Sequence, residues 1–108
     1  MTFNTGAALL EALVLSAVDH SDTYGYKITQ DVRSVVEVSE STLYPVLRRL
    51  QKEGYLAAYD KEYAGRNRRY YTITPTGQEH LEECRSAWRV YQKKIEDLLF
   101  GGIYNDET

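Results

Sequence analysis

The fold is decided by Ser39–Leu56, SESTLYPVLRRLQKEGYL, and by AAYDKEYAGRNRRYYTITPTG, which follows it over residues 57–77. Four apolar residues recur there at the i, i+3, i+4, i+7 spacing of an amphipathic helix, namely Leu43, Val46, Leu47 and Leu50. The opposite side of that helix carries hydroxyls, a ring and cations: Ser41, Thr42, Tyr44, Pro45, Arg48 and Lys52. A short helix with a polar face, followed by a basic-tipped hairpin, suits a DNA groove and its flanking phosphates. The stretch therefore predicts a winged helix-turn-helix.

Two helices are expected before this stretch. Residues Gly6–Val18 are almost unbroken apolar, which indicates a helix buried on most sides. Residues Tyr24–Val36 predict a second helix, with apolar positions at Ile28, Val32, Val35 and Val36. Gly25 near its start suggests a close approach between helices. The fold class is thus mainly α with a small β-hairpin.

The third helix and the hairpin have clear boundary signals. Ser39 is expected to cap the helix, and Gly54 to end it in a left-handed conformation. Pro45 lacks a backbone donor and predicts a bend or an irregular early turn. We expect strands over Tyr55–Tyr63 and Arg68–Thr74, with Ala64, Gly65, Arg66 and Asn67 as the tip.

A long last helix is expected from Thr74 and Pro75, with the threonine as cap and the proline in the first turn. Its apolar residues alternate steps of three and four, as in a heptad seam: Leu81, Cys84, Trp88, Tyr91, Ile95 and Leu98. A helix of about 25 residues is roughly 38 Å long, too long to pack wholly on so small a domain. We therefore expect a homodimer that meets at these six residues. The expected organisation is a DNA-binding domain over 1–74, a dimerisation helix over 75–100 and a flexible tail over 101–108.

Charge is distributed unevenly along the 108 residues. Residues 42–77 carry seven cations against three acids, a net charge of +4, whereas the whole chain has a net charge of −3. A basic centre between acidic ends places the phosphate-binding face in the middle of the sequence. The expected DNA contacts add Arg49 on the helix and, at the hairpin tip, Arg66, Asn67, Arg68 and Arg69.

These residues have distinct expected roles. Arg48 could bind a guanine edge in the major groove, while Thr42 and Pro45 could pack on thymine methyls. Tyr44 could bind a phosphate, and Arg49 and Lys52 could bind phosphate or pair with Glu53. The tip arginines are expected at phosphates or in a narrow minor groove, with Arg69 as the residue most apt to pair with an acid instead.

Other classes of protein find little support. No apolar run approaches a membrane span, and no leader pattern is visible, which favours a cytoplasmic protein. The single cysteine, Cys84, excludes an internal disulfide and is expected to be a packing residue. His20 and His80 are expected at the surface without catalytic partners, so neither an enzyme nor a metal or cofactor site is predicted.

Several segments together resemble the PadR family of transcriptional regulators. They are YGYKI at 24–28, ESTLYPVLRRLQKEGYL at 40–56, GRNRRYYTITPTG at 65–77 and the tryptophan-bearing last helix. The length and single terminal helix look like the short, multidrug-sensing LmrR type. The resemblance implies a homodimeric repressor on a pseudo-palindromic operator in double-stranded DNA. It also implies that Trp88 stacks a planar aromatic molecule at the dimer centre, although the rest of such a pocket has no visible match.

Alternatives remain open at this point. Trp88 can equally be a core residue of the dimer. A winged helix could serve as a protein–protein adaptor, or the chain could be a drug-binding protein with a secondary DNA role. Steep loss of DNA affinity with salt would favour the regulator over both alternatives.

Overall fold

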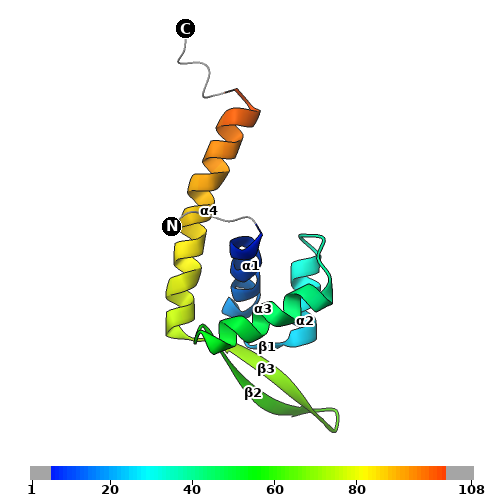
Figure 1. Cartoon of the computed structure of the whole chain (residues 1–108). Helices are drawn as coiled ribbons and strands as arrows, with labels where there is room; N and C mark the ends of the chain where they lie inside the picture. Colours follow the sequence, from blue (N-terminus) through cyan, green and yellow to red (C-terminus); the bar gives the residue numbers. More distant parts are fainter. Residues whose placement is uncertain (1–5, 102–108) are drawn as a thin grey trace.

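The computed structural model describes residues 6–101, whose helices and strands are arranged as Figure 1 shows. In chain order they are α1 (Ala7–Asp19), β1 (Thr23–Tyr24), α2 (Gly25–Arg33), α3 (Glu40–Lys52), β2 (Leu56–Tyr63), β3 (Arg66–Ile73) and α4 (Pro75–Leu99). The β2–β3 hairpin projects to one side as the wing, and the C-terminal half of α4 extends beyond the rest of the described chain. The predicted winged helix-turn-helix with a long final helix is confirmed.

Helix α3 begins and ends where its sequence signals place it. The Ser39 hydroxyl accepts a hydrogen bond from the Thr42 amide at 3.2 Å, and Gly54 follows the helix with a φ of 83°. The helix is unbroken from Glu40 to Lys52, so the expected irregular early turn at Pro45 is wrong.

The sheet has three antiparallel strands in the order β1-β3-β2, where only the hairpin was predicted. β1 is two residues long, too short for an alternating pattern to reveal, and pairs Thr23 with Tyr71. The hairpin turn is also tighter than expected. It consists of Ala64 (φ 52°) and Gly65 (φ 80°) alone, and Arg66 pairs with Tyr63 inside the ladder. Such two-residue turns match the twist of the strands when both residues have positive φ.

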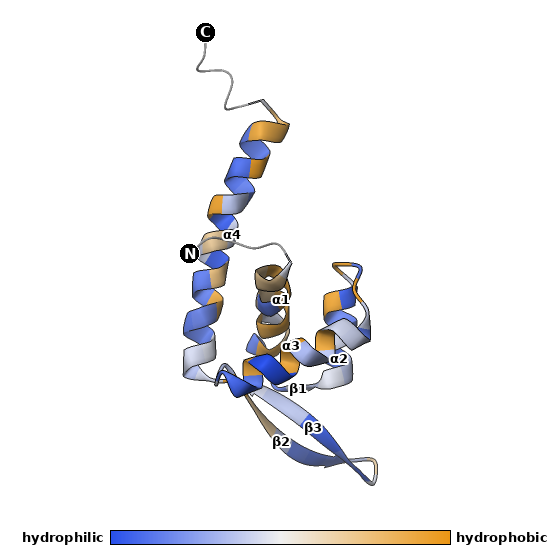
Figure 2. Ribbon diagram, viewed as in Figure 1, coloured by the Kyte–Doolittle hydropathy of each residue, from blue (hydrophilic) through white to orange (hydrophobic). Residues whose placement is uncertain are grey.

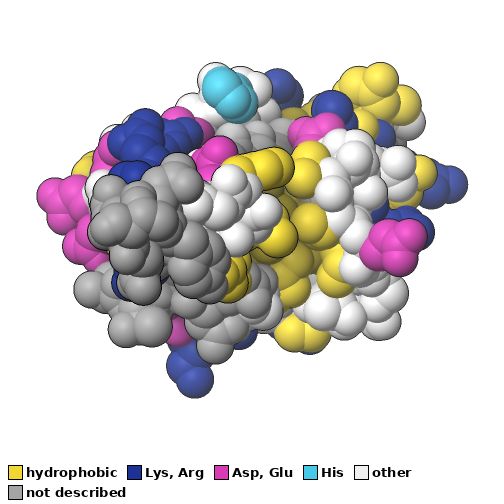
Figure 3. Space-filling view, turned by 90° about the horizontal axis from the view of Figure 1, so that it is seen from above, with side chains coloured by type: hydrophobic (Ala, Val, Ile, Leu, Met, Phe, Trp, Pro, Cys, Tyr) yellow, Lys and Arg dark blue, Asp and Glu magenta, His cyan; other side chains and the backbone are white. Residues whose placement is uncertain are grey.

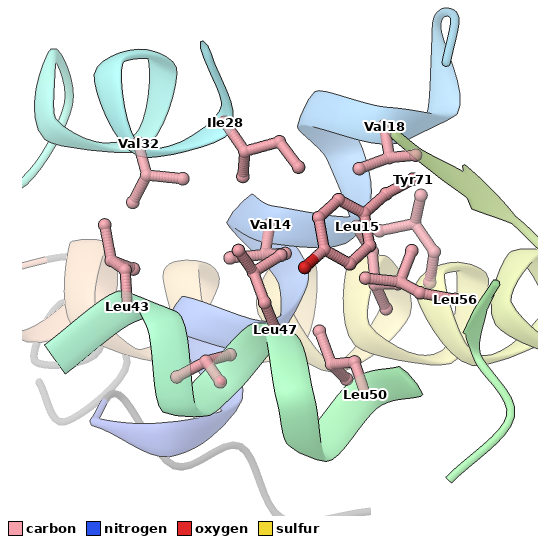
Figure 4. Packing of buried hydrophobic residues seen from close by; sticks show 12 residues of the cluster. Val14, Leu15, Val18, Ile28, Val32, Leu43, Leu47, Leu50, Leu56 and Tyr71 are labelled. Atoms are coloured by element: carbon pink, nitrogen blue, oxygen red, sulfur yellow. The ribbon is translucent and has the colours of Figure 1, made fainter. Parts of the chain in front are cut away.

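The core lies where α1, α2 and α3 meet the inner end of the sheet (Figure 4). Helix α3 contributes the four residues of its predicted apolar stripe, all buried. Residues from the other elements that complete the cluster are Val14, Leu15, Val18, Ile28, Val32, Leu56, Tyr71 and Leu81. A Cβ on Gly25 would lie 3.3 Å from the Tyr44 ring, which confirms the expected close approach of α2 and α3.

Two expectations for the helices are wrong. Helix α2 ends at Arg33 rather than Val36, and Val35 is 68% exposed because it lies in the following loop. Leu81 and Cys84 of the predicted heptad seam are buried inside the single chain, so they belong to its own core and cannot meet a partner. Helix α4 packs on α1 before it leaves the domain, which explains why the lower half of the seam is already covered. Of the predicted tail, all but Gly101 lies outside the described residues.

The junction between wing and α4 is tightly packed. The Thr74 hydroxyl accepts a hydrogen bond from the Gly77 amide at 2.9 Å and donates one to the Gly54 carbonyl at 2.6 Å. A Cβ on Gly77 would overlap the carbonyl oxygen of Tyr55, a backbone atom that cannot move aside. The direction in which α4 leaves the wing therefore depends on glycine at this position.

Replacement of Gly77 by alanine is expected to lower the free energy of unfolding by about 3 kcal/mol, because backbone must shift to admit the methyl group. Urea unfolding followed by circular dichroism measures the change. Gln78→Ala, at the adjacent exposed position, should change stability by less than about 0.5 kcal/mol. Equal stability of the two variants would contradict the packing described for the junction.

Candidate nucleic-acid interface

The outward side of α3 carries one stripe of exposed residues. Ser41, Pro45, Arg48 and Lys52 follow one another at steps of four, three and four, directly opposite the buried stripe. The hydroxyl of Ser41 lies 2.9 Å from that of Ser39, so the start of the stripe is rich in hydroxyl groups. The stripe ends with two cations, Arg48 and Lys52, which pair with no carboxylate among the described residues. This side of α3 is the part of the helix able to enter a groove.

The other expected contacts of α3 lie on its two flanks. Thr42 places its hydroxyl 2.9 Å from that of Ser39, beside the outward stripe. Tyr44 lies on the opposite flank, is half-buried and packs with its ring against Gly25. It lines a hollow of about 610 Å³ between α3, the start of α2 and the wing, together with Tyr26 and Arg69.

Arg49 faces α1 instead of the outward side. Its guanidinium lies 3.2 Å from one carboxylate oxygen of Glu11 and 4.0 Å from Glu53. The expected pairing with Glu53 is present, but the shorter contact is with Glu11, 38 positions away in the sequence. Arg49 therefore links α3 to α1 in this structure, and its expected contact with a DNA phosphate stays a prediction.

Glu11 also contacts α4 through His80. The second carboxylate oxygen lies 3.2 Å from the His80 ring, which stacks on Tyr55 with 4.3 Å between ring centroids. The expectation that His80 is a surface residue is wrong, since the side chain is largely covered. The only sequence signal for this cluster is a single acid, Glu11, in an otherwise almost unbroken apolar stretch.

The wing presents its cations in different ways. Arg66 and Asn67 are exposed beside the turn, as expected. Arg69 lies 3.8 Å from Asp60, which agrees with its expected tendency to pair with an acid. Arg68 is instead stacked between two rings, with its guanidinium carbon 4.0 Å from the Tyr24 centroid and 4.1 Å from the Tyr63 centroid. Most of the wing that projects away from the helices is hydrophilic (Figure 2).

A second, apolar hollow lies far from the wing, between α1, α4 and the loop after α2. Its volume is about 380 Å³, and its walls include Leu9, Leu13, Val36 and Trp88. Trp88 is 38% exposed there. Seen from above in Figure 3, hydrophobic side chains gather across the middle of the face. Sequence analysis identified Trp88 as a candidate ligand-binding residue but not the other lining residues. The apolar residues of α1 and of the loop after α2 had the pattern of ordinary helix core.

Cys84 lies one turn before Trp88 and is fully buried. Burial raises the pKa of its thiol, and the nearby carboxylates of Glu11 and Glu83 raise it further. A raised pKa disfavours the reactive thiolate, so the expected packing role suits this site better than redox chemistry.

Within residues 6–101, no group of histidine, cysteine and acidic side chains has the proximity needed to hold a metal ion. No helix in the same range has the length and apolar character of a membrane span.

Comparisons with known proteins agree with this architecture. Residues 14–83 match the model of the transcriptional regulator PadR-like family. The chain belongs to this family. A Mycobacterium tuberculosis protein, transcriptional regulator Rv3488, is 37% identical over 83 residues, which cover 76% of this chain and 78% of that protein. PadR regulators are DNA-binding transcription factors rather than enzymes, and the chain is a regulator of this kind.

Solved structures show the same fold. The Streptococcus mutans UA159 protein smu.1704 is 40% identical with a TM-score of 0.85, over 94% of this chain and 95% of that one. A PadR-like transcriptional regulator from Bacillus cereus is 32% identical with a TM-score of 0.79, over 88% and 95%.

Arg66 and Arg49 provide a direct test of the interface. Arg66→Ala should reduce the slope of log affinity against log salt by about one, because one phosphate contact is lost. Arg49→Ala should leave that slope unchanged and lower the free energy of unfolding by about 1 kcal/mol, because Glu11 loses a charged hydrogen-bond partner. Fluorescence anisotropy on a labelled duplex measures both slopes. A reduced slope for Arg49→Ala would place that residue on the DNA-binding surface.

Proposed function

We propose that the chain is a homodimeric repressor that binds a pseudo-palindromic operator and responds to a planar aromatic ligand. The observation that supports this best is the separation of three surfaces on one small protein. The outward stripe of α3 and the wing form a basic surface, the free half of α4 forms an apolar edge, and the Trp88 hollow lies between them. In this proposal residues 1–74 form the DNA-binding unit and 75–100 the dimerisation helix.

The C-terminal half of α4 supports dimerisation. Ile95, Leu98 and Leu99 are exposed, with Leu98 at 58%, on a helix that reaches beyond the domain, and the exposed Phe100 follows directly after it. Apolar side chains clustered on such a surface mark a site of association. The remaining seam residues Trp88, Tyr91, Ile95 and Leu98 supply the contact between two copies, and a twofold axis places two α3 helices on one DNA face.

Base and phosphate contacts are divided between α3 and the wing. Arg48 and Pro45 face the base edges, with Ser41 and Thr42 at the same end of the helix. Lys52, Tyr44 and the wing residues Arg66 and Asn67 bind phosphates and set the register without reading sequence. Occupation of an operator that overlaps a promoter then excludes the polymerase.

The Trp88 hollow offers a route from ligand to DNA. One of its walls is the loop that carries Val35 and Val36, and this loop leads directly into α3. A flat ligand stacked on Trp88 contacts that loop and the long helix together. Because the two half-sites lie about one DNA turn apart, a small change in the spacing of the reading helices alters affinity.

Dimeric operator binding is tested with a labelled duplex of the upstream region of this protein's own gene. The wild type should bind this duplex tightly, lose affinity steeply with salt and prefer it to an unrelated duplex. Ile95→Glu should yield monomers by sedimentation and weaken binding at least about tenfold, because a buried unpaired charge opposes association. Ser86→Glu, on the opposite side of α4, serves as the matched control. Absence of DNA binding at low salt would favour the adaptor function.

Ligand binding at Trp88 is tested with 1-aminoanthracene, a neutral planar dye. Saturable binding should quench the fluorescence of the single tryptophan and brighten the dye, because both lie in an apolar contact. Trp88→Leu should lose the dye enhancement, whereas Tyr59→Leu, far from the hollow, should keep it. Equal dye binding by wild type and Trp88→Leu would place the ligand elsewhere.

A further inference from the structure

Arg68 differs from the other cations of the wing in its surroundings. Its guanidinium lies between the rings of Tyr24 and Tyr63, at 4.0 and 4.1 Å from their centroids. The two tyrosines come from β1 and β2, the strands that pair on either side of β3. Tyr24 pairs with Tyr70, and Tyr63 pairs with Arg66, so both are diagonal neighbours of Arg68 on one face of the sheet.

The two tyrosine rings cover the flat faces of the guanidinium and leave the N–H groups at its edge free to donate hydrogen bonds. An arginine side chain carries five N–H donors in its plane, none of which is used by stacking. No carboxylate pairs with Arg68 within the described part of the chain, whereas Arg69 lies near Asp60 and Arg49 near Glu11. Arg68 is also half-buried, whereas Arg66 and Arg69 are exposed. The result is an oriented cation with unused donors.

Its position indicates what those donors bind. Arg68 lines the hollow between the wing and α3, together with Arg69 and Tyr44. A duplex that admits α3 into its major groove brings a phosphate of the groove edge to this place. The planar fork of arginine matches two phosphate oxygens, and a fork already held in place loses less conformational freedom on binding.

We propose that Tyr24 and Tyr63 are positioning residues that hold Arg68 ready for bidentate binding of one DNA phosphate between α3 and the wing. The proposal rests on the proposed DNA-binding function and adds two residues to it. Neither tyrosine needs to touch DNA. The pairing of Arg68 with its two rings, rather than its charge alone, sets its contribution to affinity.

The test is a double-mutant cycle measured by anisotropy on the operator duplex at several salt concentrations. Arg68→Ala should weaken binding about tenfold and lower the salt slope by about one. Tyr63→Leu should weaken binding about threefold, and Tyr63→Phe should restore it because the ring is retained. Tyr63 is 56% exposed, so its truncation leaves the core intact. Tyr59→Leu, which changes a ring of the same strand that stacks on Tyr70, is the control.

The double variant decides between a positioning role and a separate DNA contact. If Tyr63 acts through Arg68, then Arg68→Ala with Tyr63→Leu should bind no more weakly than Arg68→Ala alone. Additive losses, or full affinity in Tyr63→Leu, would overturn the positioning role while leaving wild-type DNA binding intact. Failure of the wild type to bind in a salt-sensitive way would overturn the proposed function, and this inference with it.

Discussion

A single half-buried carboxylate, that of Glu11 on α1, connects the reading helix to the long helix. It lies 3.2 Å from both Arg49 of α3 and His80 of α4, and its side chain is only 18% exposed. A carboxylate withdrawn from water needs such partners, because an unpaired one would cost several kcal/mol. Its two oxygens therefore fix how α3 and α4 sit on α1. This contact therefore gives the outward stripe of α3 and the apolar edge of α4 a defined relative position.

The junction of wing and α4 supplies the second constraint. Thr74 caps α4 and bonds the end of α3 at Gly54, while Gly77 packs against the Tyr55 carbonyl. Together with the Glu11 cluster, this leaves the long helix little freedom to rotate on the domain. In the proposed ligand response, the signal therefore reaches α3 by another route. We propose the loop at Val35, which is exposed, borders the Trp88 hollow and precedes α3.

Most of the fold was predictable because its signals are local. The apolar stripe of α3, the Ser39 and Thr74 caps and the glycine after α3 each depend on a few neighbouring residues. The features that were missed depend on distant ones. Strand β1 exists only through its pairing with β3, and the places of Arg49 and His80 follow from Glu11, far away in sequence. At the site, the outward stripe was predictable from helical spacing. The stacking of Arg68 requires three strands to assemble and could not be read from periodicity.

In the proposed dimer, two copies place their α3 helices in successive major grooves on one side of a duplex. Hydroxyl-radical footprinting on the upstream region of the gene tests this arrangement. Two equivalent protected segments are expected on the same face of the DNA, with centres about 10 base pairs apart. Flanking protection from each wing should lie outside them. A single protected segment, or protection without twofold symmetry, would contradict the dimeric arrangement.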